Sequence, residues 1–320
     1  MKIIQNCSNQ NYSKINMIDV LIWKAGLLSY KKLGYTTKIY CTKSDLQFLK
    51  DVKLLQYYDE IDDTTLETNV EWRDNINQEV FWALNKFIAI EHEFELDNEF
   101  CYSDTDIIIN EPINFDDVDL LVWSVEGQKF TEAPSIYLDW KLMSMPVNYK
   151  MPKYLKEQGI SNFNCGLVYL KNKSDFKAWK KLMLDFMKNN PGILSEDLKN
   201  KEAYKAAFMC NAEQRILTAY ANHKKLKIKL YDEQSNYRGM CEKGIHFYGW
   251  RFCWKFWADK ENMPINTYIA LSDFVNMCLN LLVELGCPKE EIELLLSFPE
   301  ISIASDFRAI AETITSIYKK

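Results

Sequence analysis

The sequence lacks a CxxC pair, although it contains nine cysteines, an odd number. Most of these cysteines stand among apolar residues, where a free thiol behaves as a small hydrophobic side chain. An odd count without paired spacing argues against a secreted disulfide scaffold and against a structural zinc site. We therefore expect the protein to reside in a reducing compartment.

Long apolar runs are also missing, since no stretch approaches the roughly 18 to 20 residues that a membrane-spanning helix needs. The first seven residues read as a β-strand and contain no signal-peptide apolar region. These two absences predict a cytoplasmic protein without a transmembrane segment.

Positive charge is not in excess, because the net charge is −6. A protein without a basic field is not expected to bind nucleic acid. Internal repeats and low-complexity tracts are absent as well. What the chain does have is 320 residues of which 48% are hydrophobic, enough for a substantial core.

Strand and helix signals alternate along most of the chain. Such alternation is typical of parallel βαβ units, in which ligands bind at the carboxyl ends of the strands. We expect an α/β domain over residues 1–260 and a C-terminal helical appendage over residues 261–320. The predicted strands cover 2–7, 38–41, 99–103, 120–125, 166–170 and 227–231, and the predicted helices cover 17–33, 78–90, 175–188, 212–222 and 266 onward.

Residues 99–109 carry the clearest functional signal. An apolar, β-prone run leads into Asp104 and Asp106, and three isoleucines follow. Two carboxylates oppose burial there, because an unpaired carboxylate is expensive to desolvate. Mn²⁺ or Mg²⁺ at the end of the strand would resolve this conflict, and such ions commonly accompany phosphate-bearing substrates. A strand that ends in a solvated Asp-Thr-Asp turn is the alternative.

His246 is one of only three histidines in the chain. A lone histidine is more often a structural residue than a ligand. A neutral imidazole is nevertheless a natural third ligand for a Mn²⁺ ion that two carboxylates already hold. Arg251 and Lys255 follow closely, and their cations suit phosphate oxygens.

Three further places carry polar side chains that would suit a sugar or its phosphates. Gly166 permits close backbone approach to a ligand and the amide of Asn164 can bind hydroxyls, although for this stretch alone a tight turn before a strand is the favoured explanation. Glu213 and Gln214 begin a predicted helix, where an acidic residue is ordinary. Lys86, taken alone, reads as a solvated lysine on the helix before the Asp pair.

In this order the segments resemble nucleotide-sugar glycosyltransferases of the GT-A fold, a Rossmann-like mixed sheet, and most closely those of glycosyltransferase family 8. The resemblance covers roughly residues 1–257. Its motifs are the DxD at Asp104-Thr105-Asp106, the F-N-(A/S)-G segment at residues 163–167, the D-Q pair at Glu213-Gln214, and the H-x-x-G at residues 246–249.

The resemblance implies metal-dependent transfer of a sugar from a nucleoside-diphosphate-sugar donor to a hydroxyl of a glycan or other acceptor. It further implies retention at the anomeric carbon and a place in surface or capsular glycan synthesis. Asp104, Asp106 and His246 would bind Mn²⁺ or Mg²⁺, with Asp104 also leaning toward the ribose.

Roles at the donor follow from the same resemblance. Gln214, Glu213 and Asn164 would orient the sugar as catalytic residues. The residues implied in substrate binding are Tyr12, Lys86, Asp104, Asn164, Gly166, Gly249, Arg251 and Lys255. The family usually has Lys-Pro-Trp after its H-x-x-G, whereas this chain has no proline there. The diphosphate contact is therefore left open between Arg251 and Lys255.

Two other functions fit parts of the pattern. In a phosphohydrolase of the haloacid dehalogenase type, Asp104 would attack phosphorus, but about a hundred residues precede it and the acidic pair Asp116-Asp117 follows too soon. In a non-catalytic nucleotide-sugar-binding module, the fold would persist without turnover. Glu213 in place of the family's aspartate and the missing Lys-Pro keep that alternative open.

Overall fold

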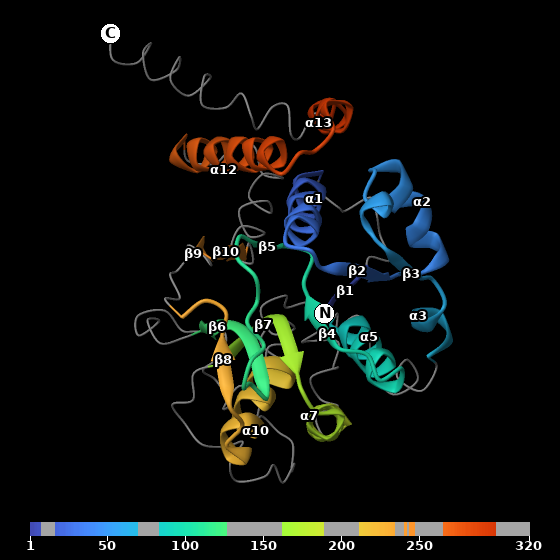
Figure 1. Cartoon of the computed structure of the whole chain (residues 1–320), viewed down its shortest axis with the longest axis vertical. Helices are drawn as coiled ribbons and strands as arrows, with labels where there is room; N and C mark the ends of the chain where they lie inside the picture. The colour runs from blue at the N-terminus through green and yellow to red at the C-terminus, as the bar shows by residue number, and fades with distance from the viewer. Residues whose placement is uncertain are drawn as a thin grey trace, which may run out of the picture.

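The computed structural model describes residues 1–7, 17–69, 83–126, 162–188, 211–233, 240–241, 243–246 and 265–298. Within these ranges the chain forms a mixed α/β structure with a seven-stranded sheet and a separate three-stranded sheet (Figure 1). The strand order of the large sheet is β3-β2-β1-β4-β7-β6-β8. The expected α/β class is confirmed.

The large sheet is mostly parallel. Strand β7 alone among its members runs antiparallel to its two neighbours, β4 and β6. Its strands are β1 (Lys2–Asn6), β2 (Thr36–Tyr40), β3 (Glu60–Asp62), β4 (Phe100–Ser103), β6 (Leu120–Glu126), β7 (Asn162–Leu170) and β8 (Ile228–Leu230). The small antiparallel sheet contains β5 (Ile107–Ile109), β9 (Met240–Cys241) and β10 (Gly244–His246).

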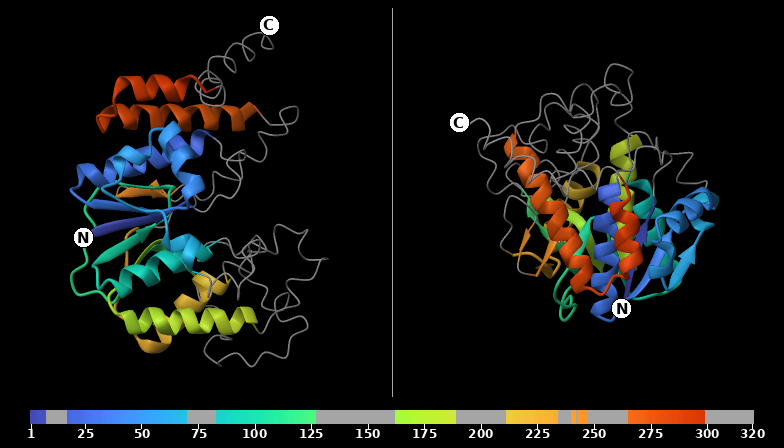
Figure 2. Two further views of the ribbon diagram at one scale, coloured as in Figure 1. Left: turned by 90° about the vertical axis from the view of Figure 1, so that its right-hand side faces the viewer. Right: turned by 90° about the horizontal axis from the view of Figure 1, so that it is seen from above.

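Helices cover both faces of the large sheet. Figure 2 shows α1 and α2 on one face, α5 and α7 on the other, and α12 and α13 stacked outside α1. The helices are α1 (Met17–Lys32), α2 (Lys43–Asp51), α3 (Thr65–Thr68), α5 (Leu84–Glu95), α7 (Lys173–Lys188), α10 (Ile216–Lys224), α12 (Ile265–Glu284) and α13 (Lys289–Leu296), with a 3₁₀ turn η2 (Leu55–Tyr57) and a π-helical turn η5 (Asn211–Arg215).

The buried core follows the alternation of side chains along the strands. Ile3 packs in the cluster that contains Trp123 of β6, whereas its neighbour Ile4 packs in the cluster that contains Phe87 of α5 and Trp179 of α7. Successive residues of a strand point to opposite faces, so a strand covered on both sides is apolar throughout.

Helix α1 is buried around most of its circumference. It ends as the sequence predicts, because Gly34 adopts a positive φ of 79° and its N–H bonds back to the carbonyl of Lys31. The N–H of Tyr35 bonds to the carbonyl of Tyr30 at 3.0 Å, which completes a Schellman-type end.

Helices α12 and α13 share a hydrophobic cluster with α1. Phe274, Val275 and Cys278 of α12 are buried in it. An ion pair between Lys24 of α1 and Glu291 of α13, 2.5 Å long, adds a buried polar contact. The helical character predicted beyond residue 265 is confirmed for α12 and α13. The predicted boundary between residues 260 and 261 lies outside the described residues.

Two local expectations are wrong. Residues Asn164 and Cys165 lie inside β7 rather than in a turn before the predicted strand 166–170, because β4 and β6 pair with the strand on both sides. The isoleucines after Asp106 do not continue β4. They form β5 in the small sheet, where β10 supplies the pairing that keeps them buried.

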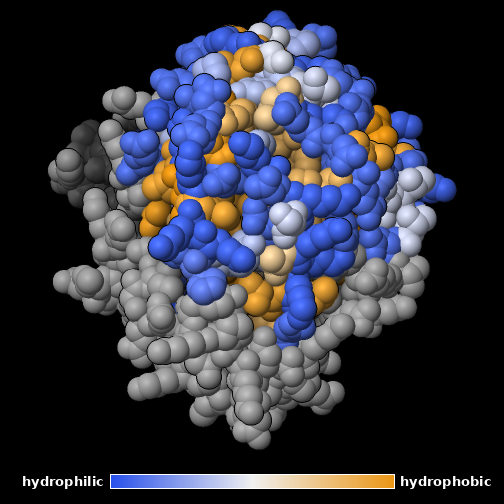
Figure 3. Space-filling model, turned by 60° about the horizontal axis from the view of Figure 1, so that its bottom comes forward, coloured by the Kyte–Doolittle hydropathy of each residue, from blue (hydrophilic) through white to orange (hydrophobic). Residues whose placement is uncertain are grey.

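The surface of the described residues offers little large apolar area. Met1, Ile61, Leu96, Val283 and Leu296 are the large hydrophobic side chains exposed there, and they lie on different elements. Figure 3 shows hydrophilic residues over most of the described part of one face, with the hydrophobic areas broken into patches. Among the described helices, none combines the length and apolar composition needed to cross a membrane.

Candidate functional site

The end of β4 places Asp104 against β7. The register pairs Ser103 with Leu167, so the next residue on each side brings Asp104 opposite Gly166. The N–H of Asp104 donates to the carbonyl of Gly166 at 2.6 Å, which extends the ladder by one bond. Asp104 therefore stands at the carboxyl end of a central strand, as the sequence predicts.

The small sheet brings His246 to the same place. Strand β10 runs antiparallel to β5, with His246 paired with Ile107. Ile107 directly follows Asp106, so the pairing sets the histidine beside that carboxylate. Two registers, one in each sheet, thus assemble residues that are far apart in the sequence.

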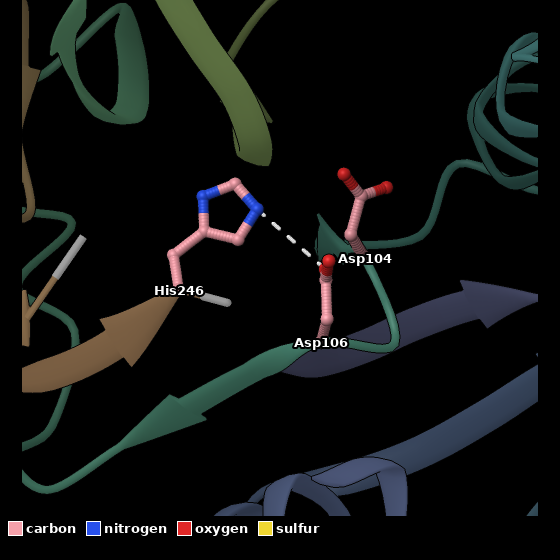
Figure 4. A group of neighbouring side chains, drawn as sticks. All are labelled: Asp104, Asp106 and His246. Carbon is pink, nitrogen blue, oxygen red and sulfur yellow. Dashed lines mark ion pairs between the residues drawn. The ribbon is translucent and has the colours of Figure 1, made fainter. Parts of the chain in front are cut away.

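Asp104, Asp106 and His246 form a cluster whose ligand atoms lie within 4.8 Å of one another. The Nε2 atom of His246 is 3.5 Å from Oδ1 of Asp106. Figure 4 shows the imidazole pointing toward Asp106, with the carboxylate of Asp104 on the adjoining turn. Asp106 and His246 are buried, whereas the side chain of Asp104 is 34% exposed. The structure brings the three predicted metal ligands together.

The imidazole of His246 contacts two other residues. A Cβ atom added at Gly166 would come 2.5 Å from Cε1 of the ring, so only glycine leaves room for it. The indole of Trp123 meets the imidazole edge-on, with ring centroids 5.7 Å apart. These neighbours restrict the orientation of the ring, as partners around a metal-binding histidine usually do.

Side-chain hydrogen bonds hold the backbone around the Asp pair in place. The carbonyl of Asp104 accepts hydrogen bonds from Nε2 of Gln5 at 3.1 Å and from Oγ of Ser103 at 2.9 Å. The hydroxyl of Tyr30 donates to the carbonyl of Ile107 at 3.1 Å. Sequence reasoning missed Gln5 and Tyr30, because each reads as an ordinary residue of a buried strand or helix.

Lys86 is buried rather than solvated. Its ammonium donates to Oε1 of Glu213 at 2.6 Å and to the carbonyl of Cys165 at 2.8 Å, and it lies 3.3 Å from Oδ1 of Asp104. Burial alone would lower the pKa of Lys86, but the negative charges of Asp104 and Glu213 outweigh it and raise that pKa above its ordinary value. The side chain is therefore a permanent cation.

Tyr102 links this cation to the Asp pair. Its hydroxyl lies 2.6 Å from Oδ1 of Asn6 and 3.1 Å from Oδ1 of Asp104, and its ring lies 4.8 Å from the ammonium of Lys86. Burial and the nearby charge of Asp104 raise the pKa of the phenol well above its usual range. Tyr102 therefore serves as a hydrogen-bond donor at any ordinary pH.

The expected sugar-orienting residues line the same region. Asn164 uses its side-chain oxygen to accept the N–H of Gly166 at 2.9 Å. Glu213 is buried beside Lys86, and its backbone carbonyl accepts a bond from Nε1 of Trp179 at 3.1 Å. The side-chain oxygen of Gln214 is buried and has no hydrogen-bond partner among the described residues.

The remaining predicted residues cannot be placed. Tyr12, Gly249, Arg251 and Lys255 lie outside the described residues. Their predicted contacts with the base and the diphosphate therefore stay predictions. The turn that carries Glu213 and Gln214 is π-helical, a geometry that occurs often at functional sites.

The charges and ligand types of the cluster fit a divalent cation. Ion pairs join Lys86 to Asp104 and Glu213, and Asp106 lies beside His246. With a neutral imidazole, three carboxylates and one ammonium leave two negative charges. Two carboxylates and one imidazole are the donors that Mn²⁺ accepts, and Mg²⁺ is less suited to the nitrogen.

Comparison with known proteins assigns nothing further. No family model matches the chain, and the search of curated proteins found no match. The site's interpretation therefore depends on its own geometry and on the resemblance of its motifs.

Proposed function

We propose that this protein is a metal-dependent glycosyltransferase of the GT-A fold, which transfers a sugar from a nucleoside diphosphate to an acceptor hydroxyl. The observation that carries the proposal is the cluster of Asp104, Asp106 and His246 at the carboxyl end of β4. Ligands of open α/β sheets bind outside the carboxyl ends of the strands. The position of the cluster at this end of the sheet supports the binding of a donor there.

The fit of the cluster to a divalent cation supports a substrate that carries a diphosphate. A cation held by Asp104, Asp106 and His246 would supply Lewis-acid stabilisation of the charge that develops on the departing diphosphate. Asp104 is the most exposed of the three ligands, so it stands nearest the solvent from which a donor arrives. The resemblance assigns it the additional contact with the ribose.

Polar groups beside the cluster support a sugar as the group transferred. The buried side-chain oxygen of Gln214 lacks a partner among the described residues, and a sugar hydroxyl would satisfy it. Glu213 accepts a hydrogen bond from Lys86, and Asn164 directly precedes Cys165, whose carbonyl accepts another, so both supply further polar groups beside the cluster. The resemblance extends this to retention at the anomeric carbon and to a glycan acceptor of surface or capsular type.

Calorimetric titration with a panel of nucleoside-diphosphate sugars, with and without Mn²⁺, tests the proposal, followed by assays for transfer and donor hydrolysis. We expect binding and turnover that a chelator abolishes and that Asp106→Ala reduces by at least about a hundredfold. Metal-independent turnover, or full activity of Asp106→Ala, would contradict it.

The same panel separates the two other functions. Metal-dependent binding of a donor without any turnover would identify a non-catalytic binding module. Release of phosphate from a simple phosphoester, together with loss of that activity in Asp104→Asn, would identify a phosphohydrolase instead.

A further inference from the structure

Lys86 stands where local helix preferences disfavour it. It is the third residue of α5, and the positive end of the helix dipole repels a cation in the first turn. The residue is only 5% exposed, and a buried ammonium is costly unless it is paired. Its position must therefore be explained by its partners.

Those partners come from three separate elements. They are Glu213 on η5 at 2.6 Å, the carbonyl of Cys165 on β7 at 2.8 Å, and Asp104 after β4 at 3.3 Å. An ammonium has three protons, and three acceptors surround this one. The ring of Tyr102 lies over the ammonium as well, 4.8 Å away.

Each acceptor is joined to a residue already placed in the site. Cys165 lies between Asn164 and Gly166, and Gly166 supports the imidazole of His246. Glu213 precedes Gln214 in η5. Asp104 belongs to the cluster of carboxylates and histidine. One ammonium thus contacts β7, η5 and the residue that follows β4, the three places that carry Asn164, Gln214 and Asp104.

We propose that Lys86 is a positioning residue, which fixes Asp104, Glu213 and the β7 backbone relative to one another and does not contact the donor. The inference rests on the proposed function and differs from the substrate contact that the sequence resemblance implies. Two of its protons are donated to Glu213 and to the carbonyl of Cys165, and Asp104 pairs with the ammonium at 3.3 Å, so its neighbours are groups of the protein itself.

A charge-matched double variant separates positioning from simple attraction. Lys86→Met removes a cation and Glu213→Gln removes an anion, so the double variant keeps the net charge of the site. Any change in its affinity for Mn²⁺, measured without donor, then reports the placement of Asp104 rather than the field around it. A residue that only contacted the donor would leave this affinity unchanged.

The chain offers a matched control. Lys24 and Glu291 form a buried ion pair of 2.5 Å on α1 and α13, elements that carry none of the cluster residues. The double variant Lys24→Met with Glu291→Gln makes the same exchange of charge for neutral groups. Thermal melting establishes that each variant is folded at the temperature of the titration.

We expect the Lys86→Met, Glu213→Gln variant to bind Mn²⁺ at least about tenfold more weakly than the wild type, as loss of a residue that orients a metal ligand usually does. The control variant should change by less than about threefold. If the site variant does not fold, Lys86→Gln is compared with Lys24→Gln under the same criteria.

Three outcomes are decisive. A site variant that binds Mn²⁺ as tightly as the wild type overturns the positioning role and leaves the proposed function intact. Equal weakening in the control also overturns it, because general loosening then explains the loss. A wild-type protein that binds no Mn²⁺ overturns the metal site itself and the inference with it.

Discussion

The imidazole of His246 lies directly against the Cα atom of Gly166. A methyl group on that carbon would sit 2.5 Å from Cε1 and 2.8 Å from Nε2, closer than real contacts allow. The glycine of one motif is therefore explained by the histidine of another. Because Nε2 is also the atom that faces Asp106, any displacement of the ring changes the cluster directly.

Gly166→Ala should weaken Mn²⁺ binding by about tenfold or more, because the ring must move away from Asp106 to admit the methyl group. Isothermal titration with Mn²⁺ measures the effect. Gly34→Ala is the control, since it strains a positive φ at the end of α1 and lowers stability without contacting the cluster. Equal Mn²⁺ affinity in Gly166→Ala and the wild type would show that His246 is not held by this contact.

Tyr30→Phe should lower both stability and Mn²⁺ affinity. The variant leaves the buried carbonyl of Ile107 without the hydroxyl that donates to it, which costs about 1–3 kcal/mol of unfolding free energy. It also loosens the backbone that follows Asp106. Urea unfolding and Mn²⁺ titration measure the two effects.

Tyr57→Phe provides the comparison for this variant. It removes a hydrogen bond of 2.8 Å to Oε2 of Glu291, away from the Asp pair. It should lower stability comparably and leave the Mn²⁺ affinity unchanged. A similar loss of affinity in both variants would contradict a specific role for Tyr30.

Lys24→Met should destabilise the fold strongly. The variant leaves Glu291 as a buried carboxylate without its cation, and breaking one side of such a pair costs about 3–5 kcal/mol. Denaturant unfolding gives the value. Lys289→Met is the matched control, because its pair with Glu293 is exposed and contributes at most about 0.5 kcal/mol.

Asp45 should make stability depend on pH in an unusual direction. Burial, the largest influence, raises the pKa of its carboxyl to about 6 from an ordinary value of 3.8. The folded protein therefore favours the protonated acid. Its contribution to stability is complete below about pH 4 and is lost as the pH rises through 6, by roughly 2 kcal/mol after allowance for solvent screening.

Urea unfolding of the wild type and of Asp45→Asn between pH 4 and 7 isolates this contribution, since the other groups titrate alike in both proteins. The wild type should lose stability relative to the variant as the pH rises. A difference that stays constant over this range would show that Asp45 is not held in its neutral form.

Patterns of local spacing predicted the secondary structure well where one segment dictates its own shape. Helix α1 begins and ends within a residue of the prediction, because its apolar positions and Gly34 are local signals. Strand β4 likewise ends just before Asp104. The small sheet was not foreseen, since three isoleucines continue a strand or begin another equally well until β10 pairs with them.

The residue types of the candidate site could be predicted from the sequence, but the contacts among its residues could not. Residue type alone marked Asp104, Asp106 and His246, because carboxylates in an apolar run and a rare histidine stand out. Nothing in the sequence around Lys86 indicates burial, since its three acceptors lie on elements that only the tertiary fold brings near. Gln5 and Tyr30 were missed for the same reason.

Because β7 runs antiparallel to β4, its two halves have different roles. Its opening residues, Asn162 to Gly166, reach the edge of the sheet where β4 terminates, whereas Leu167 to Leu170 run back into the interior. A saturation mutagenesis survey should consequently resolve two classes among nine consecutive positions. Changes at Asn164 and Gly166 should abolish activity while the protein remains folded, whereas changes at the core positions Phe163, Cys165, Leu167, Val168 and Leu170 should lower the amount of folded protein.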